Sequence, residues 1–126
     1  MTKVLVVDDD TDLLQMVSIV LSNNNMQVTP LEKCLEFKDY MESEKPDIVL
    51  MDIYLGECDG RDLCANLKNN KSYAGTPVIL YSAGNITAES VKKSKADDFL
   101  SKPFDISQLI SRINNYLPAK KTPEEN

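Results

Sequence analysis

The sequence has 126 residues, of which 42% are hydrophobic and 27% charged, and its formal net charge at pH 7 is −6. This length suits one folded domain with its own core, and the composition is that of a globular protein. The negative charge argues against nucleic acid or an anionic membrane as direct partners of the whole surface. No apolar run approaches the roughly 20 residues of a membrane span, and no signal-peptide pattern is present, so a cytoplasmic location is expected.

Short apolar runs that stop on polar side chains predict the strands of a sheet covered on both faces. A weaker run over residues 27–29 predicts a further short strand, which Pro30 would confine to a sheet edge or end. In chain order, the clearer runs and the residues that end them are Val4–Val7 with Asp8 and Asp9, Ile48–Met51 with Asp52, Val78–Tyr81 with Ser82, and Phe99–Ser101 with Lys102.

Apolar residues at helical spacing predict a helix after each of these strands. The first helix has capping residues at Asp10–Asp12 and ends near Asn23, and the last has a capping-box pattern at Asp105 and Gln108. The fourth, around residues 87–94, carries few large aliphatic residues, so we expect it to be the least firmly held. The second and third helices lie around Phe37–Met41 and Leu63–Leu67, and the last covers Ile106–Leu117.

Strand and helix alternate five times, which predicts an α/β fold with a doubly wound parallel sheet and helices on both faces. Right-handed crossovers follow from chain chirality. We expect a single domain over residues 1–118, followed by a disordered tail over residues 119–126.

Three cysteines, Cys34, Cys58 and Cys64, stand at spacings that match neither a metal-binding motif nor a disulfide framework. Their odd number suits a protein in a reducing compartment. We therefore expect all three to be bystanders without a redox or metal-binding role.

Three acidic residues, Asp8, Asp9 and Asp52, should meet beyond the carboxyl ends of the parallel strands, where ligands bind in such folds. Their mutual repulsion would cost on the order of several kcal/mol unless a cation neutralised it. All-oxygen ligands favour a hard ion, and Mg²⁺ fits best because it needs few protein carboxylates. The plainer interpretation, equally compatible with the local sequence, is that residues 8–10 only cap the first helix.

Asp52 has a second potential role, because carboxylates can act as nucleophiles and carry a phosphoryl group. Lys102 supplies a cation suited to phosphate, and Ser82 supplies a hydroxyl donor. Taken singly, each of these three residues is more typical of an ordinary solvated surface. Their shared position after apolar strands is what indicates a common site.

Four motifs together resemble the receiver (REC) domain of two-component response regulators, and in particular the stand-alone regulators of chemotaxis. The resemblance extends over about residues 3–117 and implies a flavodoxin-like (βα)5 fold with strand order 2-1-3-4-5. The motifs are Val-Leu-Val-Val-Asp8-Asp9-Asp10, then Leu-Met-Asp52-Ile-Tyr-Leu with Asp59-Gly60, then Leu-Tyr-Ser82-Ala83, and finally Lys102-Pro103-Phe104.

The resemblance implies that Asp52 accepts a phosphoryl group from the phosphohistidine of a histidine kinase or phosphotransfer protein. Ser82 and Lys102 would hold the phosphoryl oxygens, the Lys102-Pro103 bond would be cis, and Phe99 would be a switch aromatic. Phe99 is equally compatible with a plain core position. The residues that the resemblance assigns to Mg²⁺ are Asp8, Asp9, Asp52 and the backbone carbonyl of Tyr54.

The resemblance also implies a signalling module that catalyses only its own phosphorylation and dephosphorylation and is not otherwise an enzyme. It would control a downstream protein target and could form a homodimer on phosphorylation. Lys95 departs from the family, since a glycine is often found at that position before the fifth strand.

Two other classes of function compete with this interpretation. A haloacid-dehalogenase-like phosphohydrolase would also use an aspartate nucleophile, but would want a second aspartate two residues later, where this chain has Tyr54. A passive adaptor with a vestigial acidic pocket would not need the full set of site residues that the sequence retains.

Overall fold

The structure, a computed structural model, describes residues 1–117. The predicted tail over residues 119–126 and the predicted domain boundary at residue 118 lie outside the described residues. Within the described part, no helix has the length and apolar character that crossing a membrane requires.

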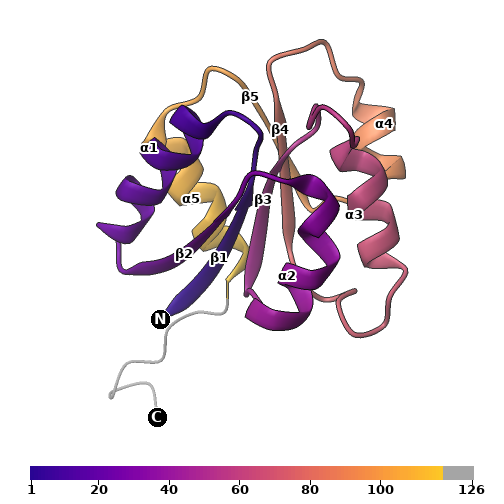
Figure 1. The fold of residues 1–126 in the computed structure, drawn as a ribbon. Coiled ribbons are helices and arrows are strands. Elements are labelled where there is room, and N and C mark those ends of the chain that lie inside the picture. Colours follow the sequence, from indigo (N-terminus) through magenta and orange to yellow (C-terminus); the bar gives the residue numbers. More distant parts are fainter. Residues whose placement is uncertain (118–126) are drawn as a thin grey trace.

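Five parallel strands form one sheet in residues 1–117, in the order β2-β1-β3-β4-β5 (Figure 1), which confirms the predicted fold class and strand order. The strands are β1 (Thr2–Val7), β2 (Met26–Leu31), β3 (Ile48–Asp52), β4 (Val78–Ser82) and β5 (Asp98–Ser101). The helices are α1 (Thr11–Ser22), the short 3-10 helix η1 (Cys34–Glu36), α2 (Phe37–Glu44), α3 (Gly60–Lys68), α4 (Ala88–Lys93) and α5 (Ile106–Tyr116).

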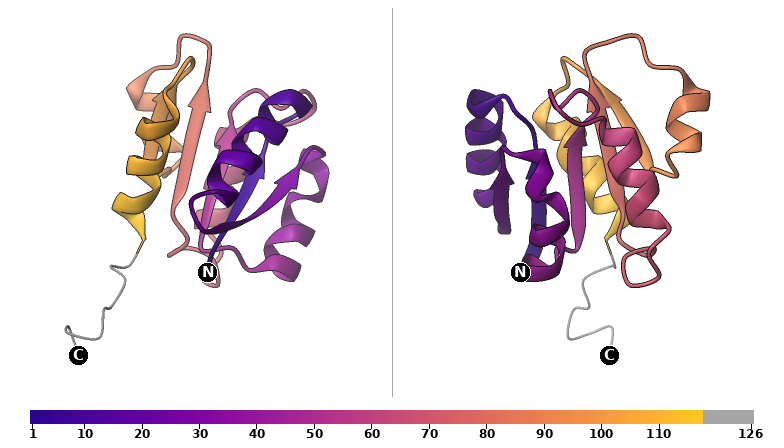
Figure 2. Two further views of the ribbon diagram at one scale, coloured as in Figure 1. Left: turned by 90° about the vertical axis from the view of Figure 1, so that its left-hand side faces the viewer. Right: turned by 45° about the vertical axis from the view of Figure 1, so that its right-hand side comes forward.

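Helices cover both faces of the sheet, with α1 and α5 on one side and α2, α3 and α4 on the other (Figure 1), an arrangement that can also be followed in the turned views of Figure 2. Successive strand residues point to opposite faces. In β1, Val4 and Val6 pack in the core under α1 and α5, while Leu5 and Val7 pack in the opposite core. The short strands are therefore apolar throughout because both of their faces are buried.

The second strand lies at an edge of the sheet and pairs only with β1 within the described residues. Pro30 is paired with Val6, and the strand continues beyond it to Leu31. The predicted edge position is confirmed, but Pro30 does not end the strand, because its missing N–H faces a side that has no neighbouring strand.

Local capping explains where the first and fourth helices begin. The carboxylate of Asp10 accepts hydrogen bonds from the backbone N–H groups of Asp12 and Leu13, both at 3.1 Å. Thr87 caps α4 by accepting from the N–H of Ser90 at 3.1 Å, and this helix has no fully buried residue, consistent with its predicted weak hold.

The predicted capping box at the start of α5 is wrong. Asp105 occupies the capping position with extended backbone angles, but its side chain makes no capping hydrogen bond. The helix is held instead by apolar burial, since its own residues Leu109 and Ile113 are buried in the core.

The structure also contradicts the expectation that the cysteines are bystanders, at two of the three positions. Cys34 and Cys58 form a disulfide with their Cα atoms 6.3 Å apart. They belong to η1 and to the loop between β3 and α3, which the fold brings together although 24 positions separate them in sequence. Disulfides depend on this spatial approach, which the sequence spacing does not reveal. Cys64 is a buried free thiol, and burial raises its pKa to about 11.

Candidate functional site

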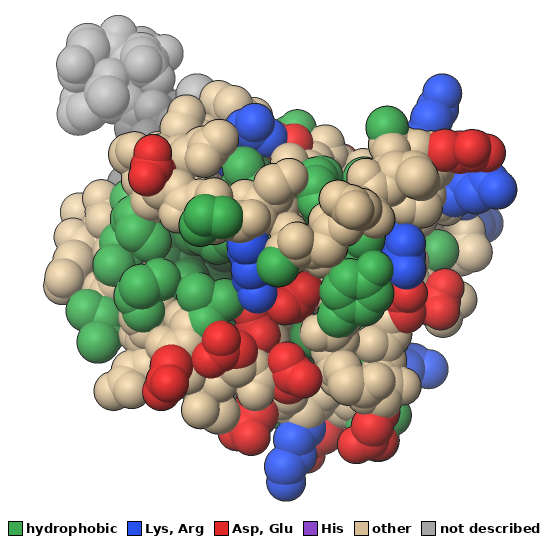
Figure 3. All heavy atoms as spheres, turned by 90° about the horizontal axis from the view of Figure 1, so that it is seen from above, with side chains coloured by type: hydrophobic (Ala, Val, Ile, Leu, Met, Phe, Trp, Pro, Cys, Tyr) green, Lys and Arg blue, Asp and Glu red, His purple; other side chains and the backbone are tan. Residues whose placement is uncertain are grey.

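The predicted site residues gather at the edge of the sheet where the parallel strands end. Asp8 follows β1, Asp52 ends β3, Ser82 ends β4 and Lys102 follows β5. Viewed from above, this face has Asp and Glu side chains gathered near its middle, with basic side chains among them (Figure 3). The strand register accounts for the gathering, since Asp52 lies opposite Tyr81, the neighbour of Ser82.

Lys102 connects two of the three predicted acidic residues. Its ammonium donates a hydrogen bond to Asp52 Oδ2 at 2.9 Å and lies 3.6 Å from Asp8 Oδ2. Asp52 is only 7% exposed and Asp8 is fully buried. A cation between two buried carboxylates offsets much of the repulsion that their burial would otherwise produce.

The protonation of Lys102 follows from these contacts. Burial on its own lowers the pKa of Lys102, but the hydrogen bond to Asp52 and the charge of Asp8 outweigh burial, so the pKa is raised. The ammonium therefore stays charged at neutral pH. It also lies 5.0 Å from the centre of the Tyr81 ring, a distance at which the ring face attracts a cation.

Asp8 is held by two further hydrogen bonds. Its Oδ2 accepts from the hydroxyl of Tyr81 and its Oδ1 from the backbone N–H of Asp10, both at 2.9 Å. Burial raises the pKa of Asp8 despite these bonds and the nearby ammonium of Lys102, all of which lower it. Of the three consecutive aspartates, only Asp10 caps α1, so the interpretation of all three as caps is wrong.

Sequence reasoning missed Tyr81 as a site residue, because it stands inside an apolar run and was counted with the strand. Its hydroxyl is the buried donor to Asp8, and burial raises the pKa of Tyr81 well above its usual value. A phenol in the residue just before Ser82 was the available signal, since a buried tyrosine hydroxyl usually needs a partner.

Ser82 lies beside the Asp52–Lys102 pair and is 1% exposed. Its hydroxyl accepts a hydrogen bond from the backbone N–H of Gly84 at 3.2 Å, and its carbonyl accepts one from the backbone N–H of Lys102 at 2.9 Å. The second bond fixes the ends of β4 and β5 to each other. It thereby places the hydroxyl and the ammonium at the same edge of the site.

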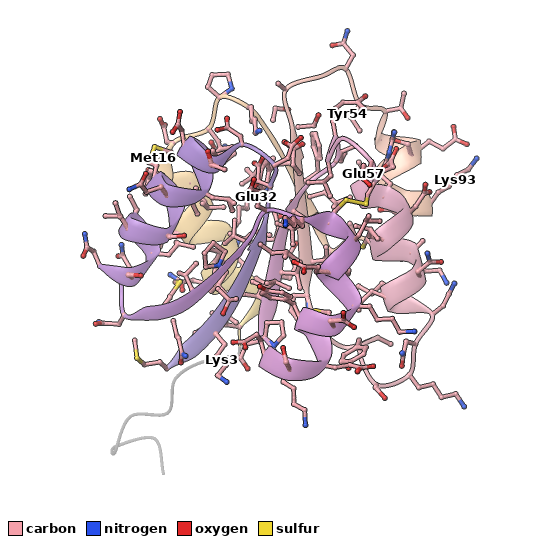
Figure 4. All side chains as sticks on the ribbon, viewed as in Figure 1. Lys3, Met16, Glu32, Tyr54, Glu57 and Lys93 are labelled. Carbon is pink, nitrogen blue, oxygen red and sulfur yellow. A yellow bond between two sulfur atoms is a disulfide. The ribbon has the colours of Figure 1, made fainter. Side chains whose placement is uncertain are left out.

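Asp9 and Tyr54 lie at the mouth of the site. Asp9 is exposed and lines a hollow of about 490 Å³ together with Gly56 and Glu57. Tyr54 is 53% exposed, and its backbone N–H donates to Asp52 Oδ1 at 3.1 Å. Figure 4 shows Tyr54 and Glu57 near the upper end of the molecule, beyond the strand ends.

The predicted magnesium ligands fit the ion by donor type, since Asp8, Asp9 and Asp52 offer only hard oxygen atoms. Within residues 1–117, however, no three His, Cys, Asp or Glu side chains are already arranged as a metal site. Lys102 contacts two of the three acids instead. Magnesium binding at these residues therefore stays a prediction.

Arg61, at the start of α3, is a second residue that sequence reasoning missed. Its guanidinium binds the carboxylate of Asp59 at 2.7 Å, donates to the hydroxyl of Ser90 on α4 at 3.3 Å, and lies 6.0 Å from the centre of the Tyr54 ring. The hydrogen bond from Arg61 lowers the pKa of Asp59. This arginine connects the loop after β3 to α4. No local sequence motif predicts this contact, because the two segments are far apart in the chain.

The remaining predictions concern Phe99 and the bond before Pro103. Phe99 is half-buried and packs against the core under α2 and α3, so its core position is confirmed while its switching role stays a prediction. The Lys102-Pro103 peptide bond is cis, as the resemblance implies.

Comparison with known proteins gives consistent matches. The profile of the response regulator receiver domain matches residues 4–114. Response regulator ArlR of Staphylococcus saprophyticus is 31% identical over a match that covers 100% of this chain and 56% of ArlR. The heme response regulator HssR of Staphylococcus epidermidis is 33% identical, over 93% of this chain and 52% of HssR. The chain thus spans about half the length of these curated relatives.

A solved structure agrees with the sequence matches. The receiver domain of the Francisella response regulator 1452 superposes with a TM-score of 0.82 at 33% identity, over 92% of this chain and 96% of that one. The five-stranded order accords with these matches. The chain belongs to the family of response regulator receiver domains.

Proposed function

We propose that Asp52 accepts a phosphoryl group from the phosphohistidine of a histidine kinase or phosphotransfer protein. The conformational change that follows phosphorylation controls a downstream protein partner. The contact between Asp52 and the Lys102 ammonium supports this most directly. An aspartate in a largely buried acidic site, paired with a phosphate-binding cation, is suited to receive and hold a phosphoryl group.

In the proposed step, a carboxylate oxygen of Asp52 attacks phosphorus and forms an acyl phosphate. The phosphorus–nitrogen bond to the donor imidazole breaks, and the imidazole nitrogen keeps the electron pair. Lys102, already within hydrogen-bond distance of Asp52, would move its contact to a phosphoryl oxygen. The chain supplies no phosphohistidine of its own, because it contains no histidine.

Asp8, Asp9, Asp52 and the Tyr54 carbonyl are the residues that would hold Mg²⁺. When bound, the ion supplies positive charge that neutralises the phosphoryl oxygens. The reaction therefore requires Mg²⁺, and outside this self-modification the chain is proposed to have no enzymatic activity.

The proposed switch uses Ser82 and Phe99. Hydrogen bonds to a charged group contribute about 1.5–3 kcal/mol each, so bonds from Ser82 and Lys102 to the phosphoryl group would supply about 3–6 kcal/mol. Reversing a 1:99 population needs about 5.5 kcal/mol. If these bonds form mainly in the active state, the half-buried Phe99 and the weakly held α4 are the parts expected to move, and a homodimer is one outcome.

The test incubates the protein with Mg²⁺ and acetyl phosphate and measures its intact mass. We expect a gain of one phosphoryl group, its loss in the Asp52→Asn variant, and its loss when a chelator removes Mg²⁺. Asp47→Asn is the matched control, because Asp47 is exposed just before β3, at the edge of the sheet opposite the site, and its replacement should leave labelling unchanged. Labelling that persists in Asp52→Asn would refute the assignment.

The same preparation discriminates the phosphohydrolase alternative. A phosphohydrolase would release phosphate from unrelated phosphate esters over many turnovers. We expect no sustained turnover, since Tyr54 stands where that class of enzyme would place its second aspartate. Multiple turnover that disappears in Asp52→Asn would favour the hydrolase instead.

A further inference from the structure

The Cys34–Cys58 disulfide lies beside the site, in the loop that carries Tyr54. Cys58 is four residues beyond Tyr54 and six beyond Asp52, while Cys34 opens η1 after β2. Figure 4 shows the sulfur–sulfur bond in yellow between the α2 and α3 regions, close to the labelled Glu57. The bond therefore joins the loop after β3 to a different segment of the same sheet edge.

The loop from residue 54 to residue 59 is a tight turn between the disulfide and the site. Leu55 N–H donates to the carbonyl of Cys58 at 3.1 Å, and Tyr54 and Asp59 form an isolated β-bridge. At its first residue, the turn is tied to the site by the Tyr54 N–H bond to Asp52. Fixing Cys58 to η1 therefore fixes the turn that presents the Tyr54 carbonyl.

The same bond borders the hollow that contains Asp9. Cys34 lines that hollow together with Asp9, Gly56 and Glu57. Gly56 lies close to Asp9, since a Cβ built on it would be 3.5 Å from Asp9 Oδ2. The disulfide thus sets how closely η1 approaches the turn around Asp9, the most exposed of the three aspartates predicted to bind magnesium.

The disulfide is within reach of small molecules. Both cysteines line an apolar groove of about 410 Å³ between α2 and α3, whose other residues include Phe37, Leu63 and Leu67. Cys58 is half-buried, whereas Cys34 is 5% exposed. Disulfides that open onto the surface are the ones that exchange readily with small thiols.

After reduction, the thiol of Cys34 would have a hydrogen-bond acceptor nearby. Cys34 Sγ lies 3.7 Å from the carbonyl oxygen of Leu55. A disulfide sulfur has no proton to donate, but a Cys34 thiol could donate a weak hydrogen bond to that oxygen. Opening the bond would therefore leave a polar contact between η1 and the turn in place of a covalent one.

We propose that Cys34 and Cys58 are a reversible redox pair whose oxidation rigidifies the turn at Tyr54 and strengthens Mg²⁺ binding at the site. This inference rests on the proposed function for the identity of the metal ligands. It predicts that the oxidised protein binds Mg²⁺ at least threefold more tightly than the reduced protein, because a preorganised ligand loses less freedom on binding.

Oxidation balances with a small disulfide such as oxidised glutathione as the co-reactant. The Cys58 thiolate, the more exposed of the two, attacks one glutathione sulfur and releases one glutathione, forming a mixed disulfide. The Cys34 thiolate then attacks the sulfur of Cys58 and releases the second glutathione. Two protein thiols lose two electrons, glutathione disulfide gains them, and the two protons end on the released glutathione thiols.

The first measurement counts thiols. The protein is equilibrated with oxidised or reduced glutathione and then unfolded and alkylated, and its intact mass is measured. We expect one alkylated cysteine in the oxidised sample and three in the reduced sample, with Cys64 as the constant one because it is buried and its thiol pKa is about 11. Three alkylated cysteines under both conditions would overturn the proposal.

The second measurement titrates Mg²⁺ into each form by calorimetry. The Cys34→Ser/Cys58→Ser double variant should keep the weaker affinity in either glutathione buffer, whereas the matched Cys64→Ala variant should keep the full redox response. Equal Mg²⁺ affinity in the two forms, including no binding in either, would overturn the inference. If Mg²⁺ affinity depends on the redox state but Asp52 is not labelled by acetyl phosphate, the proposed function is overturned and the redox pair is still supported.

Discussion

The hydroxyl of Tyr81 donates a hydrogen bond to the buried carboxylate of Asp8 across 73 positions of the sequence, at 2.9 Å. The tyrosine lies in β4, and the aspartate follows β1, with β3 between these two strands. The bond stabilises the ionised form of Asp8 where burial opposes it. It therefore connects the stability of the fold to the charge of the site.

Tyr81→Phe should lower the free energy of unfolding by about 1.5–3 kcal/mol at neutral pH, because it removes a hydrogen bond donated to a charged carboxylate. The pKa of Asp8, already raised by burial, should rise further. The loss of unfolding free energy in Tyr81→Phe should become smaller as the pH falls through the pKa of Asp8. A protonated carboxyl is stabilised less by the hydrogen bond from the Tyr81 hydroxyl. Urea unfolding over a pH series measures the effect, and Tyr40→Phe on α2 is the control.

The sign of this pH dependence is fixed by linkage. Because the folded pKa of Asp8 is above its unfolded value, the folded protein binds more protons in the window between the two. The contribution of Asp8 to stability is complete below the unfolded pKa and is lost as the pH rises through the folded one. A Tyr81→Phe deficit that grew on acidification would contradict this account.

Gly60, the first residue of α3, packs against the backbone at the end of β3. A Cβ at this position would collide with the carbonyl oxygen of Asp52 and would lie 3.1 Å from Ile53 Cα. Gly60→Ala should therefore lower the free energy of unfolding by about 3 kcal/mol and reduce Asp52 labelling, because only backbone movement relieves the contact.

Gly75→Ala is the matched control for Gly60→Ala, because a Cβ at Gly75 would have no neighbour within 4 Å. Its effect on the free energy of unfolding should stay within about 0.5 kcal/mol. Chemical denaturation of both variants checks the pair. Equal effects would show that crowding against Asp52 is not what matters.

Lys95 adopts a left-handed backbone conformation, with φ of 64°, just after α4. A side chain there is strained, and glycine avoids the strain. Lys95→Gly should raise the free energy of unfolding by about 0.5–1 kcal/mol, despite the loss of an exposed hydrogen bond to Asn69.

Lys92→Gly gives the opposite expectation, since Lys92 lies within α4 in a helical conformation. It should lower the free energy of unfolding by about 1 kcal/mol. Thermal or urea unfolding of the two lysine variants distinguishes the backbone effect from a general effect of removing a lysine. Destabilisation by both changes would count against strain at Lys95.

The Cys34–Cys58 bond closes a loop of 24 residues that contains α2 and β3. Restricting the unfolded chain in this way should contribute about 3.5 kcal/mol to the free energy of unfolding. Urea unfolding with and without a reductant measures the contribution, and the Cys34→Ser/Cys58→Ser variant should not respond to the reductant. An unchanged midpoint after confirmed reduction would refute this estimate.

The sequence by itself determined the alternation of strands and helices and the polar residues at the strand ends. Short apolar runs must be buried on both faces, and parallel strands place their carboxyl ends at one edge, so the sequence alone assigns Asp8, Asp52 and Ser82 to that edge. Asp10 as a cap was equally readable, because capping involves neighbours in sequence.

Only the tertiary structure decided which of these groups touch. Lys102 lies between Asp8 and Asp52, Tyr81 supplies a phenol to the same site, and two cysteines join loops that local spacing leaves unrelated. Such contacts depend on strand order, on how the crossovers bring distant loops together and on side-chain rotamers. None of these is a property of a single stretch of sequence, whereas periodicity and capping are.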